Sequence, residues 1–155
     1  MREMGNRNGE AFSHGKFGTM CYCLGEYDKA KENLDKAHAI RVEIGDRKGE
    51  AADYGKLGVV LESLREYGKA KEYLKNALAI RIKIGDRAGQ AADHENLGTV
   101  FQSLGEYEKA KEYLEKALAI RVKTGDRTGQ AANYGNSGTL SQSLGEYSIL
   151  GKHLP

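Results

Sequence analysis

Residues 51–90 read AADYGKLGVVLESLREYGKAKEYLKNALAIRIKIGDRAGQ, and residues 91–130 repeat this stretch with 27 identities in 40 positions. The triplet Gly-Asp-Arg begins at residues 45, 85 and 125, and a related Gly-Asn-Arg begins at residue 5. A fixed period of this length is typical of solenoids, in which each repeat is one supersecondary unit. We therefore predict a single tandem array over residues 1–155. Its repeats are expected at about 6–45, 46–85, 86–125 and 126–155, the last of them incomplete.

Each repeat is predicted to form two antiparallel helices, which makes the fold all-α. In the second repeat the first helix is expected from about Arg47 to Leu64, and the second from about Tyr67 to Ile84. Apolar and small residues recur there every three or four positions, as on the buried face of an amphipathic helix. The expected buried residues are Ala51, Tyr54, Leu57, Gly58, Leu61 and Leu64 in the first helix, and Tyr67, Ala70, Tyr73, Leu74, Ala77, Leu78 and Ile80 to Ile84 in the second.

Most of the 20 glycines fall at fixed positions in the repeat. One set is expected to end helices in a left-handed conformation. It comprises Gly25, Gly105 and Gly145 after the first helices, and Gly45, Gly85 and Gly125 after the second. Asp46, Asp86 and Asp126 follow the latter and are suited to cap the next helix.

A further set of glycines lies inside the first helices, where glycine costs about 1 kcal/mol relative to alanine. A cost repeated at one register requires a structural reason, and the simplest is a close approach of the neighbouring helix. The members of this set are Gly18, Gly58, Gly98 and Gly138.

The composition excludes several classes of protein. The net charge is only +2, from 24 basic and 22 acidic residues, so nothing indicates binding to nucleic acid or to an anionic membrane. No apolar run is long enough to span a bilayer, and the N-terminus lacks the apolar core of a signal peptide. We therefore expect a cytoplasmic protein, in which Cys21 and Cys23 are reduced thiols.

No catalytic or cofactor site is predicted, so we do not expect an enzyme. His14 and His94 occupy a repeat position that holds tyrosine in the other copies, which indicates packing. Gly15-Lys16 lacks the spacing and the Ser/Thr of a phosphate-binding loop. We expect no metal ion and no cofactor.

The recurrent residues resemble the tetratricopeptide repeat. The Leu-Gly step of that family corresponds to Phe17-Gly18, Leu57-Gly58 and Leu97-Gly98. Its two alanines correspond to Ala30, Ala70 and Ala110 and to Ala37, Ala77 and Ala117. The resemblance implies a right-handed superhelical solenoid whose first helices line the concave side.

The period departs from the family's usual 34 residues. Val42, Ile82 and Val122 stand where proline commonly ends the unit. The 40-residue period with Gly-Asp-Arg resembles the subclass found in G-protein-modulator and spindle-orientation scaffolds and in large multi-repeat animal proteins, and similar arrays occur in bacterial signalling proteins. The fourth copy decays, with Ser137 and Ser141 at core positions and Leu150 at an alanine position, so we interpret the chain as a fragment of a longer array or a short paralogue.

The resemblance also implies a binding groove on the first helices. The candidate groove residues are Lys16, Thr19, Tyr22, Lys56, Glu62, Asn96, Thr99, Gln102, Asn136, Thr139 and Gln142. The hypothesis is an extended peptide or protein segment, with an acidic part near the lysines of the first two repeats. Family members that clamp a C-terminal carboxylate carry a lysine where this chain has Gly15, Gly55 and Gly135, so that ligand class is disfavoured.

Other readings stay open at this point. The polar candidate residues are alternatively ordinary solvent-exposed helix faces that bind no ligand. The chain is alternatively a structural segment that associates with itself through uncapped ends, or the regulatory arm of a larger signalling protein.

Overall fold

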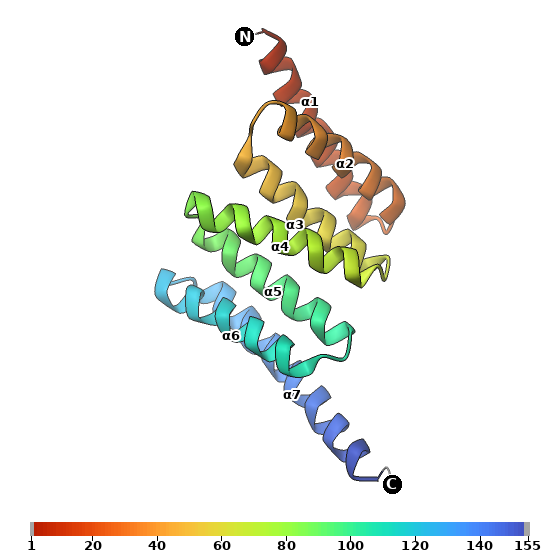
Figure 1. Cartoon of the computed structure of the whole chain (residues 1–155), viewed down its shortest axis with the longest axis vertical. Coiled ribbons are helices and arrows are strands. Elements are labelled where there is room, and N and C mark those ends of the chain that lie inside the picture. The colour runs from red at the N-terminus through yellow and green to blue at the C-terminus, as the bar shows by residue number, and fades with distance from the viewer. Residues whose placement is uncertain (1, 154–155) are drawn as a thin grey trace. The chain divides into compact units, whose positions relative to one another are not determined.

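The computed structural model describes the backbone of residues 2–153 and the side chains of residues 5–142, and within this part it contains helices and no strand. The all-α prediction is therefore confirmed (Figure 1). The helices are α1 Arg2–Cys23, α2 Tyr27–Glu43, α3 Arg47–Ser63, α4 Tyr67–Ile84, α5 Arg87–Ser103, α6 Tyr107–Thr124 and α7 Arg127–His153.

The chain divides into two compact units, Met1–Asp86 and Arg87–Pro155. In the first unit α1 packs against α2 and α3 against α4, while α2 also lies against α3 (Figure 1). In the second unit α5 packs against α6, which in turn lies against α7. The first unit is thus two stacked helix pairs, and the second unit is one pair followed by the single helix α7; in both, the second helix of a pair contacts the first helix of the next copy. That the four copies form a single array stays a prediction.

The turns between helices follow the predicted chemistry. Gly25, Gly45, Gly85, Gly105 and Gly125 have φ between 73° and 78°, in the left-handed region that L-residues rarely adopt. Arg65 takes the glycine position after α3 and has φ 63°. The Oδ1 atom of Asp46 accepts a hydrogen bond from the Gly49 amide at 3.0 Å, and Asp126 accepts one from Gly129 at 2.9 Å. The predicted caps at Asp46 and Asp126 are therefore confirmed.

The predicted turn at Gly145 is wrong. The helix α7 continues without a break from Arg127 to His153. In the other pairs the second helix folds back because alanine and leucine pack on the first helix, as Ala30 and Leu34 do. The sequence after Tyr147 lacks that pattern, so nothing draws the chain back and the helix simply extends.

The predicted close approach at the mid-helix glycines is confirmed in three of the four copies. A Cβ atom on Gly58 would lie 2.6 Å from Cγ of Leu74, and one on Gly18 would lie 2.8 Å from Cγ of Leu34. Gly98 and Leu114 have the same relation at 3.0 Å. The prediction fails at Gly138, which has open space around it because no second helix folds back onto α7.

The core lies between the paired helices, largely as predicted. Leu57, Leu61 and Leu74 are at most 1% exposed. The end of α4 is an exception, because Ile82 is 58% and Ile84 is 43% exposed. Ile82 follows the buried Ile80 by two positions, which places it on the other side of the helix. Ile84 ends the helix, where there is less neighbouring structure to cover it.

Within the part of the chain that the structure describes, no helix combines the length and the apolar character needed to cross a membrane.

Candidate functional site

The candidate groove of the first unit lies between α1 and α3. Lys16 and Thr19 come from α1 and Lys56 from α3, and all three are exposed. They line one open cavity of about 440 Å³ together with Phe12, Gly15, Met20, Cys23 and Arg41. The structure therefore brings together the predicted groove residues of two different repeats.

A second, smaller cavity of about 150 Å³ adjoins the first. It is lined by Thr19, Tyr22, Leu34, Lys56, Val59 and Val60, and its wall is almost wholly apolar. Thr19 and Lys56 line both cavities, so the two are adjacent parts of one groove. Part of its wall is formed by the buried core of this unit, since Leu34 and Val60 belong to both.

The electrostatics of the groove are cationic. Within the described part of the chain, neither Lys16 nor Lys56 has a carboxylate within ion-pair distance. Lys16 instead lies over the ring of Phe12, with its Nζ atom 5.4 Å from the ring centre. By contrast, lysines on α2 are paired, as Lys31 is with Asp35 at 2.8 Å. The two groove lysines are therefore available to an external acidic group.

Tyr22 and Glu62 differ in their relation to the groove. Tyr22 is half-buried, contributes to the apolar cavity and packs against Tyr27 with ring centres 5.5 Å apart. Glu62, also half-buried, lines neither of the two cavities described above. Burial raises the pKa of the Glu62 carboxyl above its ordinary value. Tyr22 therefore lines the groove, whereas Glu62 does not line either of its two cavities.

The predicted groove residues of the second unit lie on α5 and α7. Asn96, Thr99 and Gln102 are half-buried residues of α5, spaced by three. On α7, Asn136 is half-buried and Thr139 and Gln142 are exposed. Both threonine hydroxyls donate back to the carbonyl four residues earlier, at 3.1 Å in each case. The amide side chains are therefore the groups of this stripe best suited to meet a ligand.

A second polar cluster holds the turns together and was missed from the sequence. In the first unit Arg41, near the end of α2, pairs with the cap residue Asp46 at 3.1 Å. Its Nε atom lies 3.0 Å from the carboxylate of Asp53 on α3, which is 1% exposed. Burial raises the pKa of Asp53 to about 6, and the nearby Arg41 and Lys56 offset this only in part. Arg41 thus links α2 to α3 by ion pairs.

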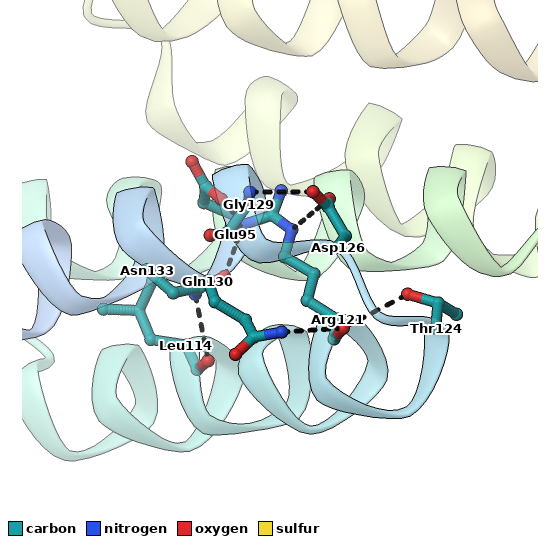
Figure 2. A network of polar contacts seen from close by, with 8 residues as sticks. All are labelled: Glu95, Leu114, Arg121, Thr124, Asp126, Gly129, Gln130 and Asn133. Carbon is teal, nitrogen blue, oxygen red and sulfur yellow. Dashed lines mark hydrogen bonds and ion pairs between the residues drawn. The ribbon is translucent and has the colours of Figure 1, made fainter.

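Figure 2 shows the corresponding network in the second unit, centred on Arg121 of α6. The guanidinium pairs with Glu95, donates to the side-chain oxygen of Asn133 and donates to the Gly129 carbonyl at 3.3 Å. Asn133, which is fully buried, also donates to the Leu114 carbonyl at 3.3 Å. Asn133 takes the repeat position of Asp53, so here Glu95 supplies the negative charge.

The arginine networks explain the glycine that occupies the third helical position at residues 49 and 129. A Cβ atom on Gly49 would lie 2.6 Å from Cδ of Arg41, and one on Gly129 would lie equally close to Cδ of Arg121. The recurrence of arginine, glycine and Asp/Asn at one spacing was visible in the sequence. We interpret these networks as structural, since they join consecutive helices within a unit.

Two histidines pack against tyrosine rings, whereas His14 has polar neighbours: its Nδ1 lies 3.4 Å from Oδ1 of Asn33 and its Nε2 lies 3.9 Å from the Glu10 carboxylate. The His94 ring lies 5.8 Å from the ring of Tyr113, and burial lowers the pKa of His94. His38 packs 4.2 Å from Tyr54, and burial lowers its pKa too. Among the described residues no group of three or more His, Cys, Asp or Glu side chains is arranged to hold a metal ion.

The tetratricopeptide repeat family matches residues 10–83 and 85–148, so the chain belongs to this family. The resemblance read from the Leu-Gly and alanine positions is thereby confirmed. Comparison with curated proteins gave no match.

Solved structures share the fold at low sequence identity. The tetratricopeptide domain of Arabidopsis FLU has a TM-score of 0.71 at 24% identity, over 76% of this chain and 98% of that one. The Rap conjugation gene regulator of the plasmid pLS20, in complex with the Phr* peptide, has a TM-score of 0.79 at 18% identity. That match covers 90% of this chain but only 39% of the regulator.

A third structure is the first tetratricopeptide domain of Spaghetti bound to an HSP90 peptide. It has a TM-score of 0.66 at 17% identity, over 89% of this chain and 95% of that one. At these identities the likeness establishes the solenoid of helix pairs and nothing about the ligand.

Proposed function

We propose that this chain is a non-enzymatic interaction scaffold that binds an extended segment of a partner protein along its first helices. The observation that carries the proposal is the α1–α3 groove, where Lys16 and Lys56 flank an open concavity without carboxylate partners. An acidic segment of a partner would supply those carboxylates. Repeat proteins of this kind bind ligands on such extended surfaces.

The amides of the second unit extend the same argument. An extended peptide carries backbone donors and acceptors that need partners when it leaves water. The side-chain amide of Asn96, Gln102 or Asn136 offers both a donor and an acceptor, so it pairs with a backbone whatever the peptide sequence. Lysine selects acidic residues, whereas asparagine holds the main chain.

Two of the similar structures contain a bound peptide, Phr* in one and an HSP90 peptide in the other. They support peptide binding as a use of this fold. The ligand proposed here differs from a C-terminal carboxylate, because Gly15 and Gly55 occupy the positions of the clamping lysines. A cytoplasmic adaptor of the long-period, scaffold-like subclass remains part of the proposal, on the strength of the 40-residue period.

A second candidate function is self-association, and one observation favours it. Phe17 and Met20 on α1 and Leu24 directly after it are 50–69% exposed. The counterparts of the first two on α3 are Leu57 and Val60, which are each 1% exposed. Sedimentation velocity over a wide concentration range separates the two functions, since stacking requires association in the absence of any groove ligand.

Selection from a displayed library of random 12-residue peptides tests the proposal. The wild-type chain is the bait, and Lys56→Glu/Asn96→Ala is the counter-bait, after circular dichroism has shown equal helicity. We expect peptides that bind the first and not the second. The proposal fails if no peptide is enriched, or if every enriched peptide binds both chains equally well.

A further inference from the structure

The α1–α3 groove contains two adjacent cavities of opposite character. The larger one has Lys16, Lys56 and Arg41 in its wall and no carboxylate; Arg41 is already paired with Asp46 and Asp53, so the two lysines supply the unpaired charge. The smaller one is walled by carbon atoms of Tyr22, Leu34, Val59 and Val60. Lys56 lies at the boundary, because it lines both.

The smaller cavity has the size of one large apolar side chain. Its volume of about 150 Å³ is comparable with apolar cavities that admit a benzene molecule. Filling it with a leucine, methionine or phenylalanine side chain would remove apolar surface from water on both partners. A polar side chain would lose hydration there, because the wall offers it almost no hydrogen-bonding partner.

From this juxtaposition we infer that the first unit recognises a two-residue signature, an acidic side chain on Lys16 and Lys56 and a large apolar side chain in the adjoining cavity. The inference rests on the proposed function and names the class of its ligand. The apolar side chain would occupy the smaller cavity, beside Tyr22 and Val59. The acidic side chain would lie in the larger cavity, beside Lys16 and Lys56.

The spacing of the signature follows from the geometry of an extended chain. Successive side chains of an extended peptide point to opposite sides, so those that face one surface are two positions apart, about 7 Å. Two cavities that share Thr19 and Lys56 are neighbours on this scale. The ligand therefore carries the acidic and the apolar residue at positions i and i+2, in one order or the other.

The repeat offers a matched control for each half of the signature. Val59 of α3 corresponds to Thr99 of α5, and Lys56 corresponds to Asn96. Compared with α3, α5 thus has a hydroxyl in place of an apolar side chain and an amide in place of a cation, and Thr139 and Asn136 of α7 repeat this pair. The signature belongs to the first unit alone.

Fluorescence polarisation with labelled nine-residue peptides tests the inference. The probes carry glutamate and leucine two positions apart, in both orders, in a Ser/Gly background, and each has versions with Leu→Ala and Glu→Gln. At least one order should bind the wild-type chain. The Leu→Ala version of that peptide should bind at least about tenfold more weakly, since the leucine loses roughly three buried carbon groups.

The protein variants locate the effect. Val59→Phe fills the small cavity, so it should weaken binding by about tenfold, whereas Thr99→Phe should leave it unchanged. Lys56→Glu should weaken binding most at low salt, because the effect is electrostatic, and Lys75→Glu on the exposed face of α4 makes the same change of charge away from the groove. Circular dichroism checks that all variants fold.

Three results would overturn the inference: no probe binds, the leucine is dispensable, or Val59→Phe and Thr99→Phe act alike. If library-selected peptides still bind in a manner that depends on Lys56 and Asn96, the proposed scaffold function stands and only the signature is lost. If no peptide of either kind binds the groove, both fall.

Discussion

At the scale of single residues, the arginine at the end of the second helix has different partners in the two units. Arg41 meets the buried carboxylate of Asp53, whereas Arg121 meets the neutral Asn133 and takes its counter-charge from Glu95. A buried ion pair carries a desolvation cost that its attraction only partly offsets. In the first unit the negative partner of the arginine is therefore Asp53, which is 1% exposed. In the second unit, where Asn133 takes the place of Asp53, the negative partner is the half-buried Glu95.

The titration of Asp53 gives a prediction for stability against pH. Its pKa is about 6 in the folded chain and 3.8 ordinarily, so the folded state binds the proton more tightly. The stability that this proton contributes is present below pH 3.8 and is lost as the pH rises through about 6. We expect Asp53→Asn to remove up to about 3 kcal/mol of the fall in unfolding free energy between pH 4 and pH 7.

Denaturant titrations followed by circular dichroism at pH 4 to 8 measure this difference. Asp28→Asn, which changes an exposed carboxylate on α2, is the matched control and should leave the slope of the wild type nearly intact. Equal pH dependence in the wild type and Asp53→Asn would show that this carboxyl does not titrate as the structure requires.

At the scale of helices, the mid-helix glycines act through their partner helix. We expect Gly58→Ala to destabilise the first unit by about 1–2 kcal/mol, because the new Cβ atom would meet Leu74 at 2.6 Å and the strain exceeds the gain in helix propensity. Gly138 occupies the same repeat position with open space around it. Gly138→Ala should therefore stabilise α7 by about 0.5–1 kcal/mol.

Chemical denaturation of both variants and of the wild type measures the change in unfolding free energy that each substitution causes. We expect the two changes in unfolding free energy to have opposite signs, because a second helix packs on Gly58 and none packs on Gly138. A loss of stability in both variants would mean that α7 has a packing partner near Gly138.

The helices themselves could be predicted closely from the sequence. The Gly-Asp-Arg and Leu-Gly positions define α3 and α4 to within one residue, because caps and periodicity are local signals. The continuous α7 could not be predicted in this way. A glycine in sequence does not show whether a second helix will fold back, since that depends on residues that follow it.

At the scale of the whole molecule, the proposed binding surface is formed by neighbouring helices within each unit. The groove stripe was predicted from the family's repeat positions and stays a prediction, while the structure brings three of its residues, Lys16, Thr19 and Lys56, around one cavity. The apolar cavity beside Tyr22 and Val59 could not be predicted, because its shape depends on how α1, α2 and α3 pack. The lack of carboxylate partners for the two lysines is likewise a property of side-chain placement, which spacing alone does not determine.

The most direct test of the central claim, that a partner segment occupies the groove, uses a thiol already present there. Cys23 is exposed and lines the larger cavity, whereas Cys21 on the same helix is 2% exposed. The rate of alkylation of Cys23 by iodoacetamide is measured by intact-protein mass, with and without a saturating selected peptide. Lys75→Cys, on the exposed face of α4, serves as the control thiol. We expect the peptide to slow the reaction of Cys23 and to leave the control thiol unchanged. Unaltered alkylation of Cys23 while polarisation shows the peptide bound would contradict it, because the ligand would then lie outside the groove.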